Sequence, residues 1–462
     1  MTAQPPIADS MIENRTFDEI AVGDTANLTR VVSQQDIDLF SVVSGDDGPS
    51  LVGAKATAHG LFAAALISNV IDTALPGPGT VCLSQDLDFL GAIRIGDAIT
   101  ATVIVTEKAA ETGTVSLDCR CANQAGALLV SGVTSVRAPT EKVRRPKLEM
   151  AEVRLSRHER FRVLLSRAAG HEPMPTAIAH PCDASAIGAA VEAAQAGLIT
   201  PILVGPKAKI LKAAEDAKVD ISAFRLIDVP HSAAAAAEAV ALVQRGEASL
   251  LMKGSLHTDE LLHAVLAPEG GLRTGRRLSH VYLMDVPSYP RPLLVTDAAV
   301  NIAPDLEAKR DIVQNAIDLA HVMGIETPRV AILSAVETIN PKLPSTLDAA
   351  ALCKMADRGQ ITGGLVDGPL AFDNAVSPEA AAEKGIVSKV AGLADILVVP
   401  DLESGNMLAK QLSFLAGADA AGVVLGARVP IILTSRADAE RTRLASCAVA
   451  VLIAHARAAV AA

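Results

Sequence analysis

The chain is 462 residues long, carries a formal net charge of −11 and is 50% hydrophobic, yet only 2% of its residues are aromatic. Such an apolar composition excludes a disordered chain, and at about 150 residues per domain the length predicts two or three packed domains. The acidic balance and the scarcity of aromatic stacking platforms exclude a typical nucleic-acid binder.

The amino terminus and the cysteines indicate the compartment in which the protein works. Residues 1–6 lack the apolar core of a signal peptide, and no uncharged apolar run reaches the about 18–20 residues that a membrane span needs. The six cysteines show no metal-ligand spacing. We therefore expect a cytoplasmic protein that binds no metal, no membrane and no nucleic acid.

The first 138 residues predict a small α+β domain. The range 37–43 favours a short helix, and 59–75 is apolar enough for a largely buried helix. Four further runs, at 79–89, 98–106, 114–121 and 128–136, have the composition of strands. We expect one buried helix wrapped by an antiparallel sheet, followed by a charged linker at 139–157.

From residue 158 onward, short apolar runs alternate with helical stretches, which is typical of parallel sheets covered on both faces. An α/β domain of this length, 158–462, is long for one sheet. We therefore expect two lobes around a cleft, with lobe I at 158–285 and 425–462 and lobe II at 286–424. The predicted strands are 176–180, 199–204, 225–229, 249–252, 281–284, 292–296, 330–334, 396–399 and 430–433, and the clearest helices are 183–196 and 207–217.

Two of these predicted strands, 396–399 and 430–433, end in polar turns. In open α/β folds, ligands bind at the carboxyl ends of strands, where backbone N–H groups and short polar side chains are exposed. The two turns together predict a site for an anionic, phosphate-bearing substrate. Their polar residues are Asp401, Ser404 and Asn406 after the first strand, and Ser435 and Arg436 after the second.

From about residue 176 to the carboxyl end, the sequence resembles the phosphate acetyl/butyryltransferase family. Each matching motif is short, but together they follow the family's order. The motifs are Ala179-His180-Pro181-Cys182-Asp183, 201–206, 252–258, Leu272-Arg273, 296–301, 366–370, 400–406 and Thr434-Ser435-Arg436. The resemblance implies a two-lobed α/β domain with mainly parallel sheets, of the isocitrate/isopropylmalate dehydrogenase-like fold. It also implies exchange of coenzyme A for phosphate on a short acyl group, with both as substrates and no permanently bound cofactor.

The family's reaction explains the residue types at the second turn. Phosphate attacks a thioester, and the tetrahedral species that forms is stabilised by fixed cations and hydrogen-bond donors. An arginine fork can hold a phosphate in two-point contact. By resemblance, Arg436 and Arg273 hold the phosphate, and Ser435 donates either to the developing oxyanion or to the departing sulfur.

The segment after the predicted strand 249–252 is a further candidate. Lys253, Gly254 and Ser255 lack the spacing of a nucleotide-triphosphatase loop, so we interpret them as a loop that binds phosphate or coenzyme A. For His257 two interpretations stay open. It either orients the substrate or satisfies nearby backbone groups.

Two other motifs also keep two interpretations. Asp297 and Asn301 lie on one loop, and they either hold the pantetheine arm of coenzyme A or position Arg273. The turn at 400–406 is either part of the binding site or a structural turn, and we favour the site.

The sequence departs from the acetyl-type members of the family in two places. A basic insert before 242–248 is missing, and 437–442 resemble the butyryl-type members. The acetyl-type general base is therefore not clearly carried over, and Asp438 is our candidate for it. The acyl-chain preference stays open between acetyl and butyryl.

Residues from about 15 to 138 resemble the MaoC-like dehydratase family, whose hot-dog domains include R-specific enoyl-CoA hydratases. The resemblance lies in 40–46, Ala58-His59-Gly60, 75–80 and Gly96-Asp97. Hot-dog domains commonly pair their sheets, which implies a homo-oligomer, a dimer or higher.

The family's catalytic pair is incomplete in this sequence. Family members place a histidine five positions after the catalytic aspartate, and together the two activate the water that adds to the double bond. Here Asp46 is present, but Leu51 stands at the histidine position and cannot take a proton. His59 and Gly60 belong to the separate motif at the start of the buried helix. Because losing a positioned acid–base group costs about 10²–10⁴ in rate, we expect a hydratase-deficient domain.

Three alternatives to this assignment stay open. The protein could be bifunctional, with Asp46 and another partner hydrating enoyl-CoA, or it could be a non-catalytic regulator that binds acyl-CoA. A decarboxylating dehydrogenase is the third alternative. The lack of a dinucleotide fingerprint and of a paired-aspartate metal site counts against it.

Overall fold

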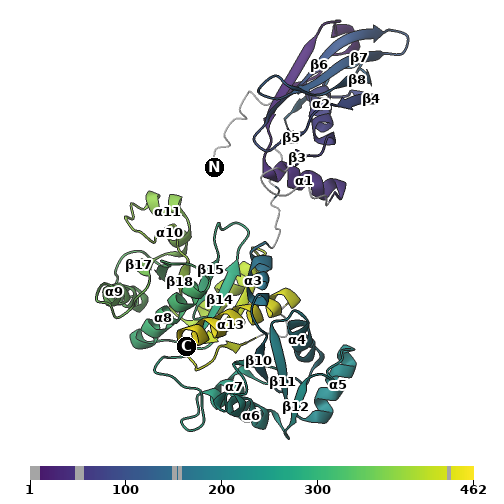
Figure 1. The fold of residues 1–462 in the computed structure, drawn as a ribbon. Helices are drawn as coiled ribbons and strands as arrows, with labels where there is room; N and C mark the ends of the chain where they lie inside the picture. Colours follow the sequence, from purple (N-terminus) through teal and green to yellow (C-terminus); the bar gives the residue numbers. More distant parts are fainter. Residues whose placement is uncertain (1–10, 47–56, 148–152, 154–158, 434–438, 462) are drawn as a thin grey trace. The chain divides into compact units, whose positions relative to one another are not determined.

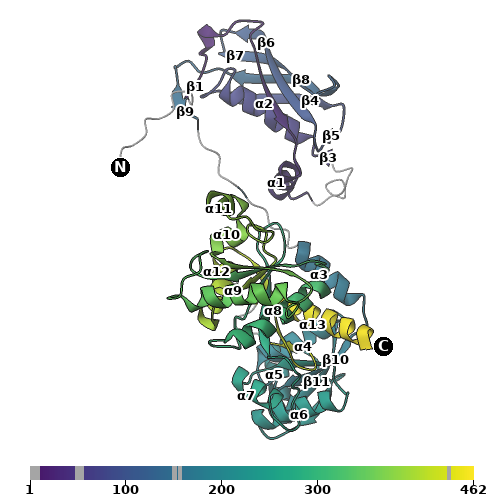
Figure 2. The ribbon, with the colours of Figure 1, turned by 90° about the vertical axis from the view of Figure 1, so that its left-hand side faces the viewer.

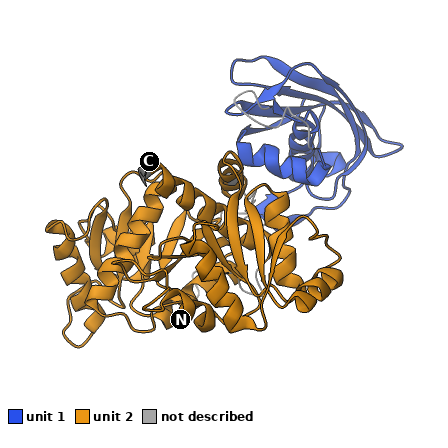
Figure 3. Ribbon diagram, turned by 60° about the horizontal axis from the view of Figure 1, so that its bottom comes forward, with its two compact units in different colours: residues 1–155 blue, residues 156–462 orange. Residues whose placement is uncertain are grey.

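The computed structural model describes residues 11–46, 57–147, 153, 159–433 and 439–461. The chain divides into two compact units, residues 1–155 and 156–462, which are considered one at a time (Figure 3). The candidate residues Leu51, Ser435, Arg436 and Asp438 lie outside the described residues.

Unit 1 is an antiparallel sheet of five strands, in the order β2-β6-β7-β8-β4, with helix α2 against one face (Figures 1 and 2). Val103 and Leu117 of the sheet and Ile67 of the helix are fully buried in the core between them. The predicted buried helix and antiparallel sheet are therefore confirmed. The elements are β1 (Met11–Glu13), β2 (Thr25–Val31), α1 (Gln34–Ser44), β3 (Thr57–Ala58), α2 (Leu61–Thr73), β4 (Val81–Phe89), β5 (Ile93–Arg94), β6 (Ala98–Ala109), β7 (Thr114–Ala122), β8 (Leu128–Arg137) and β9 (Arg144–Pro146).

Two features of unit 1 differ from the expectation. Strand β2 was not predicted, because it is an edge strand whose side chains are mostly exposed and polar, and it lacks a strong alternating pattern. The charged segment predicted as a linker contains β9, which pairs with β1 from Met11↔Pro146 to Glu13↔Arg144. Backbone pairing with a distant strand cannot be detected from local composition.

Unit 2 contains one continuous mixed sheet of eleven strands, in the order β12-β11-β10-β13-β20-β19-β14-β15-β18-β16-β17. Most neighbouring strands are parallel, as predicted, but the pairs β20–β19, β19–β14 and β14–β15 are antiparallel. The expectation of separate sheets in two lobes is wrong, because β14 and β19 join the two halves into one sheet. The strands are β10 (Met174–Ala179), β11 (Ile199–Gly205), β12 (Arg225–Asp228), β13 (Leu250–Lys253), β14 (Ser279–Asp285), β15 (Leu293–Thr296), β16 (Arg329–Leu333), β17 (Leu365–Leu370), β18 (Ile396–Val398), β19 (Asp419–Leu425) and β20 (Ile431–Ile432).

Helices cover both faces of this sheet, and apolar clusters fill the space between them (Figures 1 and 2). The largest cluster lies under α4, α8 and α13, and a second lies under α6 and α7. The helices are α3 (Glu159–Ala169), α4 (Ala184–Gln195), α5 (Lys207–Ala217), α6 (Ser232–Gln244), α7 (Thr258–Val265), α8 (Leu306–Val322), α9 (Pro344–Asp357), α10 (Phe372–Val376), α11 (Pro378–Glu383), α12 (Leu402–Phe414) and α13 (Glu440–Ala461).

One described helix, α13, is long and apolar enough to cross a membrane by length and composition. Residues 447–454 of this helix are buried, and α13 packs against β19, α3 and α4. Its apolar character is therefore that of a core helix, and it carries no argument for a membrane span.

Candidate functional site

Three parallel strands of unit 2, β10, β13 and β20, lie side by side and end at the same edge of the sheet. Ile178 pairs with Met252, and Met252 pairs with Ile432. The polar residues that follow β10 and β13 are therefore neighbours, although about 75 residues separate them in the sequence. The segment that follows β20 contains Ser435, Arg436 and Asp438, which lie outside the described residues.

The turn after β13 is hydrogen-bonded to the end of β10. Gly254 N donates to Ala179 O at 2.9 Å, and Ser255 N donates to His180 O at 2.9 Å. A Cβ atom on Gly254 would lie 2.5 Å from Ala179 O and 2.6 Å from His180 O. Glycine is therefore required here for close backbone approach, which is a structural role.

Ser255 connects this turn to His180 and to the start of α4. Its hydroxyl donates to His180 O at 2.8 Å and accepts from Cys182 N at 3.0 Å. The same oxygen lies 3.4 Å from His180 Nδ1. Asp183 follows directly and accepts a hydrogen bond from Ala186 N at 2.8 Å, which begins α4. The motif that includes His180 is thus a tightly fixed connection between β10 and α4.

His180 has an unusual backbone conformation for a residue with a side chain. Its φ is 55°, in the left-handed region. Such conformations cost free energy and cluster at functional sites. Burial, with a further contribution from Lys209, lowers the pKa of the imidazole below its ordinary value, against the opposing effect of Glu260 and Asp183. At neutral pH the ring is uncharged and can accept a proton.

His180 was not among the predicted site residues, although its motif carried the family resemblance. A histidine between a strand end and a helix-capping aspartate was the available signal. Two observations identify His180 as a site residue: its strained backbone and its contact with Ser255. Both depend on the fold.

Lys253 and His257 flank this turn in different ways. Lys253 Nζ donates to Gly254 O and Leu256 O, both at 3.3 Å, so the ammonium group lies over the turn. His257 is exposed and precedes the first turn of α7 without a side-chain hydrogen bond to cap it. Of the two interpretations for His257, satisfaction of nearby backbone groups receives no support.

The second group of candidates lies after β15 and β18, which are parallel neighbours. Asp297 is buried, and its carboxylate accepts from the backbone N–H groups of Ala299, Val300 and Asn301 at 3.0–3.1 Å. It also accepts from Asn301 Nδ2 at 2.5 Å. These contacts hold the loop itself in shape.

Asn301 contacts a different arginine from the one expected. Its Oδ1 accepts from Arg277 Nε at 3.0 Å, and its Nδ2 donates to Leu278 O at 2.7 Å. The interpretation that Asn301 positions Arg273 is therefore wrong, because the arginine that Asn301 contacts is Arg277. The two arginines are close in sequence, and only the fold distinguishes them.

Asp401, Ser404 and Asn406 form a helix start joined to the Asp297 loop. Asp401 caps α12 by accepting from Ser404 N at 2.8 Å, and Ser404 Oγ donates to the same carboxylate at 2.8 Å. Asn406 Nδ2 donates to Ala298 O at 3.3 Å. These contacts match the structural-turn interpretation of this motif.

Strands β18 and β20, which precede the two predicted polar turns, run in opposite directions in the sheet. Strand β18 runs parallel to β15, but three antiparallel steps separate β15 from β20. Consequently the carboxyl ends of β18 and β20 lie at opposite edges of the sheet, and the predicted site residues after β20 lie outside the described residues. Local sequence shows where a strand ends but not which way it runs in the sheet.

Arg273 lies at the same edge of the sheet as the Asp297 loop. It forms an isolated antiparallel bridge with Ala427, just after β19, and Arg428 N donates to Leu272 O at 3.0 Å. In the described part of the chain, Arg273 makes no ion pair with a carboxylate. Its guanidinium is therefore available to an anion, but at the edge opposite the turn after β13.

In unit 1, His59 and Gly60 of the separate motif lie at the start of α2. His59 Nδ1 accepts from Leu61 N at 3.2 Å, and its ring stacks on Phe40 with centroids 5.7 Å apart. A Cβ on Gly60 would lie 2.8 Å from the Phe89 ring, so this glycine allows close packing. Asp46 follows α1, and its backbone oxygen accepts from the Ser41 hydroxyl.

Within the described residues, no three His, Cys, Asp or Glu side chains gather as a metal site would require.

The chain matches a known family and several known proteins. The family described as "Phosphate acetyl/butaryl transferase" matches residues 231–451. A phosphate acetyltransferase from Rhizobium meliloti is 65% identical over 294 residues, which are 64% of this chain and 93% of that protein.

Two solved structures are also similar to this chain. A branched-chain phosphotransacylase from Enterococcus faecalis V583 is 32% identical, with a TM-score of 0.55, and the match covers 61% of this chain and 99% of that one. The unliganded R-hydratase PhaJ1 from Pseudomonas aeruginosa is 35% identical, with a TM-score of 0.31, and the match covers 32% of this chain and 100% of that one.

Proposed function

The chain belongs to the phosphate acetyl/butyryl transferase family, and from this premise we propose that it transfers a short acyl group between coenzyme A and inorganic phosphate. The observation that carries the proposal is the 65% identity to a phosphate acetyltransferase over 93% of that protein's length. At such identity the active-site chemistry of a family is rarely replaced, because its residues must keep both type and position.

We place the reaction at the edge where β10, β13 and β20 end. This placement is supported by the Ser255 hydroxyl, the Lys253 ammonium and His180 there, and by the segment with Ser435 and Arg436 that follows β20 in the sequence. The Lys253 ammonium, held at this strand edge, suits the charge that develops on the carbonyl and phosphoryl oxygens. Holding two substrates at one edge also removes part of the entropic barrier.

In this proposal His180 is the general base, and Asp438 is the rival candidate. When acyl phosphate reacts with coenzyme A, the neutral imidazole takes the proton from the thiol. The thiolate then attacks the carbonyl carbon, and the bond from that carbon to the phosphate oxygen breaks. In the reverse direction the imidazolium returns the proton to the departing thiolate. The lowered pKa of His180, caused first by burial, supports this role because it keeps the ring neutral.

The acyl group that we propose is acetyl. The phosphate acetyltransferase is twice as similar in sequence as the branched-chain phosphotransacylase, at 65% against 32% identity. Acetyl-, propionyl-, butyryl- and isobutyryl-CoA, each assayed with phosphate, test the choice by their kcat/KM values. We expect acetyl-CoA to react fastest, and a preference of more than about tenfold for a longer acyl group would refute it.

Unit 1 in this proposal lacks efficient hydratase activity, because Leu51 replaces the histidine that would share the proton transfer with Asp46. Its remaining role is to bind acyl-CoA or to pair two chains.

We also propose that the protein is cytoplasmic, that it forms homo-oligomers and that unit 2 has the isocitrate/isopropylmalate dehydrogenase-like fold. The alternation of strands and helices through unit 2 supports the last of these.

A further inference from the structure

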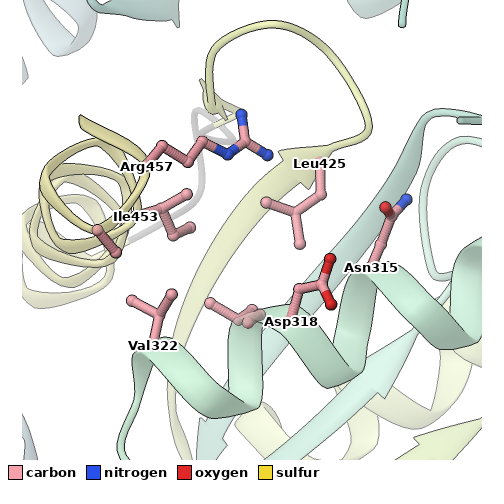
Figure 4. Close-up of a pocket in the computed structure, with 8 residues that line it drawn as sticks. Asn315, Asp318, Val322, Leu425, Ile453 and Arg457 are labelled. Carbon is pink, nitrogen blue, oxygen red and sulfur yellow. The ribbon is translucent and has the colours of Figure 1, made fainter. Parts of the chain in front are cut away.

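A pocket of about 280 Å³ lies in unit 2 between α8, α13 and the end of β19 (Figure 4). It is lined by residues that neither the proposed reaction nor the sequence motifs use. Most of its wall is apolar and comes from Leu319 and Val322 of α8, Leu425 of β19 and Ile453 of α13. An apolar pocket with a few convergent polar groups is the usual form of a small-molecule site.

One of the polar groups is the guanidinium of Arg457, which reaches from α13 over the pocket (Figure 4). Its Nη1 donates to Ala427 O at 3.1 Å and to Arg428 O at 3.2 Å, and these contacts fix its position. Packing around the group lowers its pKa from the ordinary value, although it stays charged at neutral pH. Among the described residues, Arg457 makes no ion pair. A fixed guanidinium with free N–H groups at an apolar pocket is suited to a carboxylate.

The other polar groups come from α8 on the opposite side of the pocket. Asn315 is buried, and its amide nitrogen donates to Arg277 O at 3.0 Å and to Ser279 Oγ at 2.9 Å. Both amide hydrogens are therefore used, and the amide oxygen, which faces the pocket, has no hydrogen-bond partner among the described residues (Figure 4). It can accept a hydrogen bond from a ligand.

Asp318 adds a negative charge on the same side. Its carboxylate accepts from Arg276 and, at 3.1 Å, from Gln314 Nε2. Because a carboxylate oxygen can accept more than one hydrogen bond, Asp318 can still receive a ligand donor. Its charge also disfavours a phosphate, whose multiple negative charges would lie close to it.

We propose that this pocket binds a small aliphatic α-amino acid as a zwitterion. The carboxylate of the ligand lies on Arg457, its ammonium group donates to Asn315 Oδ1 and Asp318, and its alkyl side chain lies against Val322 and Ile453. Each polar group of the pocket then has a hydrogen-bond partner on the ligand, and the apolar wall is covered. The ligand would join α8 to α13.

The test is calorimetric titration of the full chain with L-leucine, with 4-methylpentanoate, which lacks only the ammonium group, and with isopentylamine, which lacks only the carboxylate. We expect L-leucine to bind and the two partial ligands to bind at least about tenfold more weakly, since each lacks a charge-assisted hydrogen bond. 4-Methylpentanoate binding as tightly as L-leucine would refute recognition of the ammonium group. No measurable binding of L-leucine up to about 10 mM would refute the site.

Two variants test the location of the ligand. Arg457→Met removes the guanidinium and keeps most of the stem, while Val322→Phe fills the apolar part of the pocket. Both should weaken L-leucine binding at least about tenfold, whereas Arg428→Met, beside the pocket, should leave it unchanged. The thermal unfolding midpoint without ligand shows whether each variant is folded, and Val322→Phe remains informative if Arg457→Met is not. Tight binding retained by a folded variant of either kind would place the ligand elsewhere.

Discussion

His180 shows most clearly how one residue can carry function in this protein. It has a left-handed φ of 55°, lies 3.4 Å from Ser255 Oγ through Nδ1, and has a pKa lowered mainly by burial. A backbone conformation that costs free energy persists only where the surrounding structure enforces it. Here the hydrogen bonds from Ser255 to His180 O supply that enforcement.

Replacing His180 by glutamine should lower turnover by about 10²-fold or more in the direction that consumes coenzyme A. The base acts when it is neutral, so wild-type activity should rise with pH through a midpoint below 6.5, the ordinary value from which its pKa is lowered. The variant should lose this acidic limb. A pH–rate profile for acetyl phosphate and coenzyme A measures both effects.

His257→Gln is the matched control, because His257 is exposed and its side chain does not cap α7. Its profile should keep the acidic limb. If His180→Gln keeps the limb as well, His180 is not the base, and Asp438 becomes the remaining candidate.

Asp401 is a residue whose role the fold reassigns. Its carboxylate accepts from Ser404 N and Ser404 Oγ, both at 2.8 Å, at the start of α12. Asp401→Ala should therefore destabilise the protein by about 1 kcal/mol, the usual cost of losing an N-cap. Its KM for phosphate and for acetyl-CoA should change by less than about threefold. Urea unfolding and steady-state kinetics test this, and a tenfold rise in KM without loss of stability would restore the substrate-binding interpretation.

At the scale of elements, the sequence predicted the four long strands β4, β6, β7 and β8 of unit 1, its buried helix α2, and most strands of unit 2, because their patterns are local. Strand β18 is a continuous apolar run, β13 is apolar up to Lys253, and Asp183 marks the start of α4. Strand direction was not predictable, because the reversal at β19 and β14 depends on pairing between distant segments. The same pairing of distant segments brings the Asp401 turn close to the Asp297 loop. It also brings Asn301 into contact with Arg277.

The junction between β10 and β13 gives a prediction at this scale. Gly254→Ala would place a methyl group 2.5 Å from Ala179 O, so the turn after β13 must shift away from His180. We expect a loss of stability of about 1–3 kcal/mol and a marked loss of acyl transfer, measured by urea unfolding and by release of coenzyme A.

Gly188→Ala in α4 is the matched control, since its Cβ would have no neighbour nearer than 4.0 Å. This substitution should leave activity intact and stabilise the helix by up to about 1 kcal/mol. Equal stability and activity of the two variants would show that the turn after β13 does not need close approach to β10.

At the scale of the whole molecule, the chain joins two units with separate cores. The change of pattern near residue 158 predicted this division, because alternating antiparallel strands give way to strand–helix alternation. The charged segment between the units was interpreted as a linker on composition alone. Part of it is β9, whose pairing with β1 depends on residues more than 130 positions away.

Unit 1 should contribute no efficient hydration of enoyl-CoA. With crotonyl-CoA as substrate, wild type and Asp46→Ala should show equal, near-zero rates, because Leu51 cannot share a proton with Asp46. The loss of absorbance of the conjugated thioester measures the rate. A wild-type rate that Asp46→Ala lowers by about 10²-fold would instead establish a bifunctional enzyme.

The central claim, that the protein exchanges coenzyme A for phosphate on an acyl group, is tested most directly by thiol release from acetyl-CoA. We predict that release requires phosphate, that acetyl phosphate forms in equal amount, and that Arg436→Met lowers the rate by about 10²-fold or more while thermal stability is kept. Thiol release that is independent of phosphate, or that Arg436→Met leaves unchanged, would contradict the account.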